Sequence, residues 1–273
     1  MASAPQANLP LFYKDLMPLN SRDHGKWNSK NVDKATWAAT QHAIPITVDE
    51  FPQAGRHFPI IFSSGTNPVP LALMGLNEDV NTFFDEKGGA TEDFYVPAYV
   101  RRYPYLLAKL DSNSDNMSLC FDPSSDLLGE FKEGTALFDK EGQPSEHTRG
   151  ILQFCERFEE AGQRTAAFVE ELKKHDLLME GEVAIQRGDG ADAQPFVYRG
   201  FNMINQEKLR DVRGDVLRGW NQNGMLPLIY AQVLSLELMR VIFGRQTAQG
   251  KGPGAAAAAP AEKPAAASAK SKK

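Results

Sequence analysis

A single amphipathic stretch, residues 146–175, restricts the possible folds more than any other part of the chain. Apolar and small residues recur there at alternating steps of four and three, which is the spacing of one helical face. They are Ile151, Cys155, Phe158, Gly162, Thr165, Val169 and Leu172. Ser145 is well suited to cap the helix. A partner helix could cover this face, but the stripe spans only about three heptads. We therefore expect it to pack on a sheet of the same chain.

The segment before this helix has the spacing of short strands. Brief apolar runs alternate with turn residues, and we expect strands at 43–48, 58–63, 69–74, 82–84, 105–110 and 118–121, with a short helix from Asp49 to Gly55. Asp85 and Asp139 are each followed three residues later by Gly, a pattern typical of a hairpin tip. The N-terminal half is therefore predicted to form an antiparallel or mixed sheet of short strands.

The C-terminal half is predicted to contain more helix than strand. We expect strands at 182–186 and 195–198, a helix from Asn205 to about residue 220, and a final helix over 224–243. The final segment is very apolar but contains Gln232, Glu237 and Arg240, so we expect a buried amphipathic helix and no transmembrane segment. The predicted class is α+β, with the sheet packed by the long amphipathic helix and the C-terminal helices.

Composition sets the domain boundaries. The chain has 273 residues and 42% apolar residues, enough for one buried core. We expect a flexible N-terminus at 1–7, a single domain at 8–245 and a disordered basic tail at 246–273. The tail is built mainly from Ala, Pro, Lys and Gly, which supply too little apolar surface to fold alone.

Charge and cysteine usage limit the partners and the compartment. The formal net charge is -5, and the residues after 248 carry +4, which leaves -9 for residues 1–248. We expect no nucleic-acid partner for so acidic a folded domain. Cys120 and Cys155 lie in apolar surroundings typical of reduced, buried thiols. The first ten residues lack the basic start and apolar core of a Sec signal, so the expected location is the cytoplasm.

Familiar catalytic motifs are not found in the sequence. It has no Gly-rich phosphate loop, no Gly-x-Ser-x-Gly turn and no His-Glu-x-x-His helix. The five histidines are scattered, without a second His or Cys at metal-ligand spacing. We therefore expect no metal and no cofactor, name no catalytic residue and favour a non-enzymatic role.

The one candidate site lies in residues 96–105, where two prolines bracket two adjacent arginines among three tyrosines. Arg101, Arg102 and Tyr103, with His57 from another proline-flanked stretch, are the candidate ligand-binding residues. An arginine pair suits a carboxylate or phosphate, and tyrosines suit a sugar or a planar face. The alternative is that the arginines pair with acids of the chain itself, such as Asp122 or Asp126, while the tyrosines pack.

Several motifs, in order along the chain, resemble the bacterial SapC family over about residues 8–243. They are Pro10-Leu-Phe-Tyr13, Arg56-His-Phe-Pro-Ile-Ile-Phe62, Val96-Pro-Ala-Tyr-Val-Arg-Arg-Tyr-Pro-Tyr105, Leu119-Cys-Phe-Asp122, Leu137-Phe-Asp-Lys-Glu-Gly-Gln-Pro144 and Gly224-Met-Leu-Pro-Leu-Ile-Tyr-Ala-Gln-Val-Leu-Ser235. The resemblance implies an association with the bacterial surface layer. It supplies no catalytic residues.

Two functions follow from the residues and the resemblance together. The first is a non-enzymatic accessory or interaction protein of SapC type, serving surface-layer or envelope transport through protein partners of that machinery. It would support surface assembly from the cytoplasm, or reach the cell surface by non-classical export. The alternative is a small-ligand-binding protein or enzyme that acts on a carboxylated or glycosylated compound through the Arg/Tyr/His site.

Overall fold

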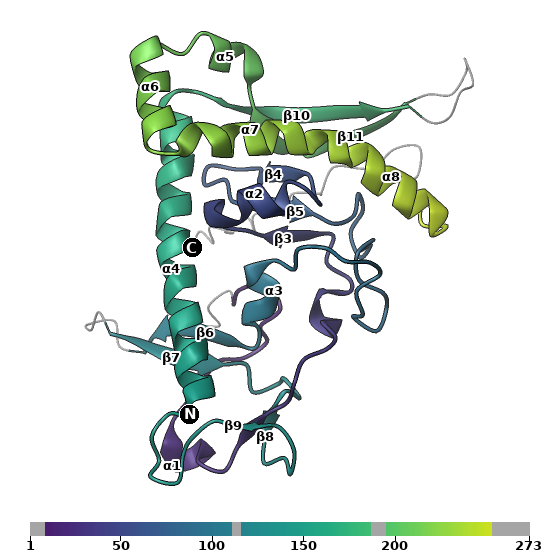
Figure 1. The fold of residues 1–273 in the computed structure, drawn as a ribbon. Coiled ribbons are helices and arrows are strands. Elements are labelled where there is room, and N and C mark those ends of the chain that lie inside the picture. Colours follow the sequence, from purple (N-terminus) through teal and green to yellow (C-terminus); the bar gives the residue numbers. More distant parts are fainter. Residues whose placement is uncertain (1–8, 111–115, 187–194, 253–273) are drawn as a thin grey trace, which may run out of the picture.

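The computed structural model describes residues 9–110, 116–186 and 195–252 (Figure 1). The predicted flexible segment 1–7 lies outside the described residues, as does most of the predicted tail. The α+β class is confirmed: one long helix, a group of C-terminal helices and antiparallel sheets make up the protein.

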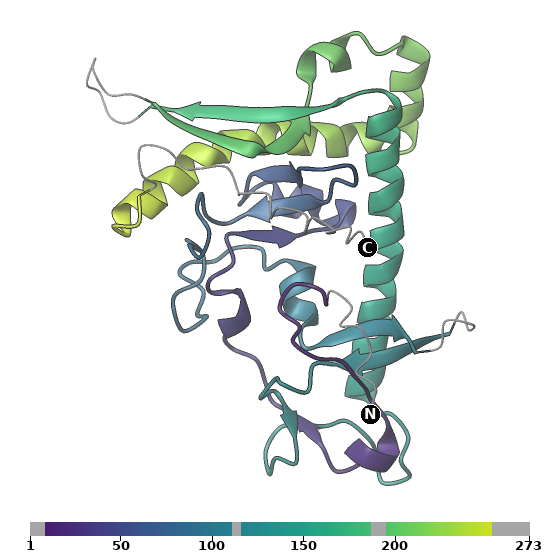
Figure 2. The same cartoon turned by 180° about the vertical axis from the view of Figure 1, so that it is seen from behind.

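Helix α4 (Glu146–Lys174) runs along nearly the whole length of the molecule, as Figures 1 and 2 show from opposite sides. Ser145 caps it by accepting a hydrogen bond from the backbone N–H of Thr148 at 3.2 Å. The stripe predicted from the sequence is the packed face, with Cys155, Thr165 and Leu172 among its buried residues. The helix and its packing within the chain are as expected.

The largest sheet joins strands from both halves of the chain. Its order is β10-β11-β4-β5-β3, and every pairing is antiparallel. The strands are β3 (Ala43–Pro45), β4 (Ile60–Ser63), β5 (Pro70–Leu73), β10 (Leu178–Ile185) and β11 (Phe196–Ile204). The link between the halves is short, with Phe201 and Asn202 of β11 opposite Ser63 and Phe62 of β4. The predicted strands 182–186 and 195–198 correspond to β10 and β11, which extend the sheet expected in the N-terminal half.

Two small sheets lie beside the N-terminal part of α4. One has the order β1-β7-β6 and the other β8-β2-β9. Their strands are β1 (Met17–Pro18), β2 (Asn28–Ser29), β6 (Tyr105–Lys109), β7 (Met117–Phe121), β8 (Leu128–Gly129) and β9 (Thr135–Ala136). The two predicted hairpin tips are present, since Phe84 bridges Ala90 and Phe138 bridges Pro144. The predicted strand 82–84 is reduced to the first of these bridges.

Short helices connect the sheets. They are α1 (Ser21–His24), η1 (Thr36–Ala38), η2 (Val48–Glu50), α2 (Phe51–Ala54) and α3 (Ala98–Arg102). The expected helix from Asp49 to Gly55 is the η2–α2 pair. Its start is fixed by a capping box between Thr47 and Glu50.

The C-terminal helices differ from expectation at two places. They are α5 (Gln206–Arg210), α6 (Gly214–Gln222), α7 (Met225–Ser235), η3 (Leu236–Leu238) and α8 (Met239–Ala248). The single helix predicted after Asn205 is broken between α5 and α6. The last helix continues past residue 243 because Gln246, fully buried, accepts a hydrogen bond from the N–H of Leu76 at 2.9 Å.

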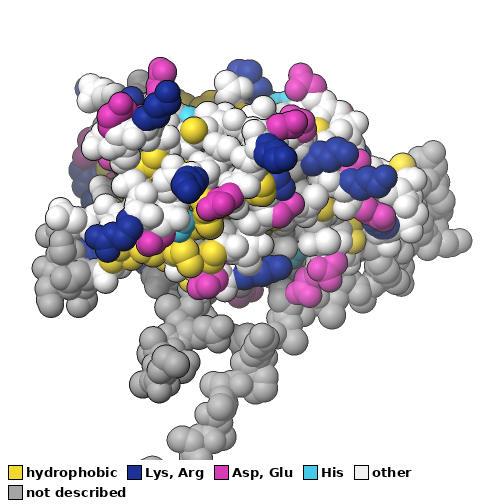
Figure 3. Space-filling view, turned by 90° about the horizontal axis from the view of Figure 1, so that it is seen from below, with side chains coloured by type: hydrophobic (Ala, Val, Ile, Leu, Met, Phe, Trp, Pro, Cys, Tyr) yellow, Lys and Arg dark blue, Asp and Glu magenta, His cyan; other side chains and the backbone are white. Residues whose placement is uncertain are grey.

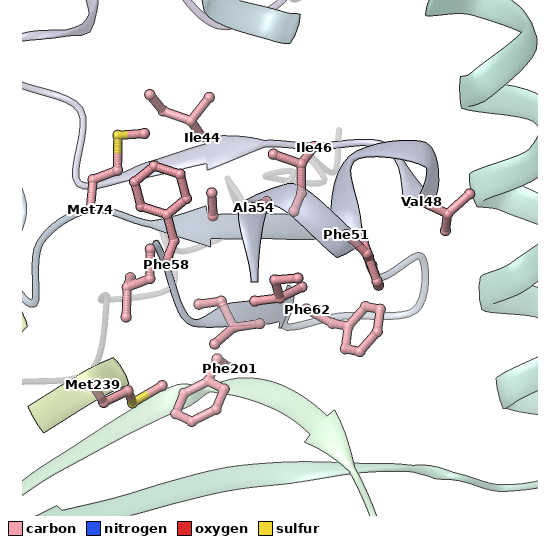
Figure 4. Packing of buried hydrophobic residues seen from close by; sticks show 14 of the residues in the cluster. Ile44, Ile46, Val48, Phe51, Ala54, Phe58, Phe62, Met74, Phe201 and Met239 are labelled. Carbon is pink, nitrogen blue, oxygen red and sulfur yellow. The ribbon is translucent and has the colours of Figure 1, made fainter. Parts of the chain in front are cut away.

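The main core lies between the five-stranded sheet, α2 and the C-terminal helices. Figure 4 shows Phe51, Phe58 and Phe62 packed among aliphatic side chains, with Phe201 of β11 and Met239 of α8 closing the cluster. Polar side chains fix α7 over the sheet: Gln232 donates to the carbonyl of Ile60 at 2.9 Å, and the N–H of Ile60 donates to Ser235 Oγ at 2.9 Å.

A second, smaller core lies at the other end of the molecule. It contains Tyr105, Phe121, Leu137 and Cys155, with Ile151 packed against it. Helix α4 contributes to both cores, through Phe168, Val169 and Leu172 at one end and Cys155 at the other. The candidate site lies beside this second core.

Candidate functional site

Helix α3 positions both candidate arginines, and a buried carboxylate holds its start. Glu50 is 5% exposed. Its Oε1 accepts from the N–H of Ala98 at 2.7 Å and from the hydroxyl of Tyr95 at 3.1 Å. Its Oε2 accepts from the N–H of Thr47 at 2.8 Å. A negative charge at a helix N-terminus is favourable. Glu50 therefore ties the capping box of η2 to the first turn of α3.

Arg102 is buried against aromatic rings. Its side chain is 5% exposed, and Nη1 lies 3.3 Å from Oε1 of Glu159 on α4. The guanidinium carbon lies 4.3 Å from the ring centroid of Phe158 and 4.9 Å from that of Tyr99. Arginine suits such stacked, desolvated positions better than lysine. Arg102 is thus paired with an acid of the chain itself, as the alternative expected, but this acid is Glu159 of α4, 57 positions further along the chain, and not Asp122 or Asp126.

Arg101 is exposed and is held by neutral groups. Its Nε donates to the carbonyl of Val96 at 3.0 Å, and Nη2 donates to the Tyr95 hydroxyl at 3.2 Å. Its guanidinium carbon also lies 5.3 Å from the ring centroid of Phe154 on α4. The Tyr95 hydroxyl thus lies between the Arg101 guanidinium and the Glu50 carboxylate.

Tyr103 packs in an aromatic group at the end of α3. Its ring centroid lies 4.7 Å from that of Trp37 and 5.3 Å from that of Tyr13. Burial, together with the charge of Asp122, raises the pKa of Tyr103 to about 12. Asp122 is fully buried and accepts hydrogen bonds from the N–H groups of Lys14 and Ser124, both at 2.8 Å. This carboxylate anchors the backbone at Lys14.

A cavity of about 910 Å³ opens between the end of α3 and the start of α4. We call it the α3–α4 cavity. Three of the four candidate residues, Arg101, Arg102 and Tyr103, line it. Its other walls are the start of β6, the first turns of α4, the end of β2 with the residues after it, and β9.

His57 lies elsewhere. It follows α2, where its ring centroid is 5.9 Å from that of Phe58, and it is not among the residues that line the α3–α4 cavity. Tyr105, His147 and Lys30 line that cavity without having been named from the sequence. Tyr105 is the last residue of the stretch 96–105, so the composition of that stretch could have identified it. His147 and Lys30 are separated from it along the chain, and no local pattern connects them.

Burial sets the protonation of several groups around the cavity. It raises the pKa of Tyr105 to about 12 and that of the Cys155 thiol to about 12. It lowers the pKa of His147, so this imidazole is neutral at pH 7. Within the described ranges, no group of three or more His, Cys, Asp or Glu side chains is arranged to hold a metal ion.

The last helices carry a second feature, an exposed apolar stripe. Tyr230, Leu234 and Val241 are 48%, 69% and 45% exposed. Tyr230 and Leu234 lie four residues apart on α7, and Val241 follows seven residues later on α8, so the three lie on one side of the helical segment. Exposed Glu237 of η3 lies between Leu234 and Val241 on that side. We call Tyr230, Leu234 and Val241 the α7–α8 stripe. The opposite face packs on the protein through Ile229, Gln232, Met239, Ile242 and Gln246.

The helical segment Met225–Ala248 is long and apolar enough to cross a membrane, judged by length and composition alone. In its most apolar window, 28% of the residues are buried. The expected buried helix is therefore buried along one face only. Figures 1 and 2 both show α7 and α8 lying along the β10–β11 hairpin at the margin of the molecule.

Charge is mixed on the face of the protein seen in Figure 3. Lys and Arg side chains alternate there with Asp and Glu, and apolar side chains gather between them. Such a surface lacks the continuous basic track that binds a phosphate backbone.

Comparison with known proteins gives one match. A family model described as SapC matches residues 19–242, most of the chain. No curated protein and no solved structure matches this chain.

Proposed function

The chain belongs to the SapC family, and on this premise we propose that it is a non-enzymatic accessory protein that serves the bacterial surface layer or envelope transport by binding protein partners of that machinery. The observation that carries the proposal is the α7–α8 stripe. Exposed apolar side chains grouped on one face of a folded protein mark interaction sites more often than single scattered side chains do.

The fold supports a docking role for this helix. The buried side is fixed by three hydrogen bonds: Gln232 donates to the carbonyl of Ile60, the N–H of Ile60 donates to Ser235, and the N–H of Leu76 donates to Gln246. A face held this firmly presents its exposed side chains in one geometry, which lowers the entropic cost of binding. Tyr230 adds a large amphipathic ring of the kind enriched at protein interfaces. Tyr230 and Leu234 are four residues apart, which is one of the spacings at which a helix contacts a groove.

The proposal has the protein act from the cytoplasm. Cys120 and Cys155 are both free and buried. Free thiols are usual where glutathione and thioredoxin keep cysteines reduced. The partner would then be the cytoplasmic part of an envelope component.

Site-specific photo-crosslinking tests the proposal. A photoreactive amino acid replaces Leu234, which is 69% exposed, in cells that make the protein. We expect a discrete adduct with an envelope protein, identified by mass spectrometry, and its loss when Tyr230→Lys is added. The same amino acid at Gln153, an exposed position on α4, should give no such adduct.

Two outcomes would contradict the proposal. Equal adducts from Leu234 and Gln153 would mean that the stripe has no preference for a partner. An adduct of Leu234 with a second copy of the chain would assign the stripe to self-association.

A further inference from the structure

Three polar atoms on residues that line the α3–α4 cavity have no hydrogen-bond partner among the described residues. They are Arg102 Nε, Tyr105 Oη and His147 Nε2. Arg102 and Tyr105 are only 5% and 6% exposed. Ser29 lies near Tyr105 and partly offsets the rise in the pKa of Tyr105 that burial causes. It is not placed to form a hydrogen bond with Tyr105 Oη. A buried polar group without a partner costs about 1–3 kcal/mol, and native proteins contain few of them.

The three residues come from three elements that meet at the cavity. Arg102 ends α3, Tyr105 begins β6 and His147 lies in the first turn of α4. The side chain of Tyr105 belongs to the same small core as Cys155, beside Ile151 on the cavity wall. The convergence of unpaired groups from distant parts of the chain is the pattern expected of a binding site.

The groups favour an anion of limited charge. Arg102 Nε and Tyr105 Oη are donors, and neutral His147 can donate or accept through Nε2. The cavity lining includes three cations, Lys30, Arg101 and Arg102, against one acid, Glu146. The N-terminus of the 29-residue helix α4 adds partial positive charge. Glu159 already shares the one buried guanidinium, so the site suits a single negative charge better than two.

The rest of the wall is apolar. Val32, Leu127, Ile151 and Phe154 line it along with the tyrosine and proline rings. A volume of about 910 Å³ lies within the range typical of small-molecule sites. Among the lining residues, Arg101, Lys30 and Glu146 are exposed, whereas Arg102 and Tyr105 are buried.

We propose that the α3–α4 cavity binds an organic monocarboxylate with an apolar body, its carboxylate on Arg102 and Tyr105 and its hydrocarbon against Ile151 and Phe154. This site is separate from the α7–α8 stripe, and each can be tested without the other.

Isothermal titration of the full chain with octanoate, octanol and octyl phosphate tests the ligand class. Octanoate should bind with a dissociation constant below about 1 mM. Octanol lacks the charge and octyl phosphate carries more than one at pH 7, so both should bind at least roughly tenfold more weakly, which is about 1.4 kcal/mol. No heat from octanoate, or equal affinity for octanol, would overturn the proposal. Tighter binding of octyl phosphate would also overturn it.

Tyr105→Phe separates binding from folding. The substitution removes an unpaired buried hydroxyl and keeps the ring, so thermal stability without ligand should be unchanged or higher. Octanoate affinity should fall roughly tenfold to a hundredfold, the value of one hydrogen bond to a charged group. Tyr198→Phe is the matched control, because Tyr198 is a partly buried tyrosine that lines a different cavity. It should leave octanoate affinity unchanged.

Leu234→Glu completes the test, since octanoate could also bind to exposed apolar surface. Affinity that falls with Leu234→Glu but survives Tyr105→Phe would place octanoate on the α7–α8 stripe and overturn the proposal. Affinity that falls only with Tyr105→Phe would support it.

Discussion

Glu50 and Arg102 are both buried ionic side chains, and they differ in how fully their hydrogen bonds are satisfied. Glu50 accepts from two backbone N–H groups and two hydroxyls. Arg102 has an unpaired Nε. A charge that is buried and fully bonded stabilises the local structure, whereas an unpaired donor costs stability and is retained where it has a further use. Glu50 therefore has a structural role, and Arg102 is available to bind a ligand.

Glu50→Ala should destabilise the protein by about 3 kcal/mol, because the N–H groups of Thr47 and Ala98 lose their acceptor in a buried site. Urea unfolding followed by circular dichroism measures the change. Glu180→Ala, at an exposed position on β10, should change stability by less than about 0.5 kcal/mol. If Glu50→Ala and Glu180→Ala lower stability by the same amount, Glu50 does not anchor η2 and α3.

Asp85 gives a prediction on pH. The N–H groups of Gly89 and Lys87 donate to its carboxylate and hold its pKa below the ordinary value of 3.8. A lowered folded-state pKa stabilises the native state above pH 3.8, and this contribution is lost as pH falls through the folded pKa. Asp85→Asn keeps the acceptor but not the charge. The gap in urea midpoint between wild type and variant should therefore be present at about pH 6 and shrink as the pH falls below about 4 and through the folded-state pKa. A gap independent of pH would contradict this.

At the scale of elements, two glycines show opposite constraints. Gly162 lies within α4, and a Cβ there would meet no atom within 4 Å. Gly181 lies at an irregularity in the β10–β11 pairing, and a Cβ there would lie 2.2 Å from the Phe201 ring. Gly162 lowers the stability of the helix although no neighbouring atom requires a glycine there. Gly181 leaves the space that the buried Phe201 ring occupies.

Gly162→Ala should stabilise the protein by about 0.5–1 kcal/mol, and Gly181→Ala should destabilise it by about 2 kcal/mol. Thermal and urea unfolding of the pair give both signs in one experiment. Destabilisation by Gly162→Ala would mean that this face of α4 needs close approach. A neutral Gly181→Ala would mean that Phe201 moves without cost.

Local patterns explain which elements were predictable. Helix α4 follows from the spacing of its apolar residues, and the two turns follow from the residues after Asp85 and Asp139. Both predictions need only a few neighbouring residues, and both are confirmed. Gly88 and Gly142 have φ of 76° and 77°, as such turns require. The pairing of β11 with β4 and the salt bridge from Arg102 to Glu159 depend on distant segments. No local signal in one sequence encodes them.

On the scale of the whole molecule, α4 connects two cores with different surroundings. The larger core lies under the C-terminal helices, whose outer face carries the α7–α8 stripe. The smaller core borders the α3–α4 cavity. The sequence indicated residues at the cavity through their composition. It did not indicate the stripe, because apolar residues in a helix predict burial and only the packing shows which side stays exposed.

The most direct test of the central claim, that the α7–α8 stripe binds a protein of the envelope, is co-sedimentation of the purified chain with washed envelope vesicles. We expect wild type to sediment with the vesicles and Leu234→Glu to stay in the supernatant. Val69→Glu, a matched change at a 45% exposed valine outside the stripe, should sediment like wild type. Protease treatment of the vesicles should abolish sedimentation of wild type. Sedimentation that survives protease, or that Leu234→Glu leaves unchanged, would contradict the account.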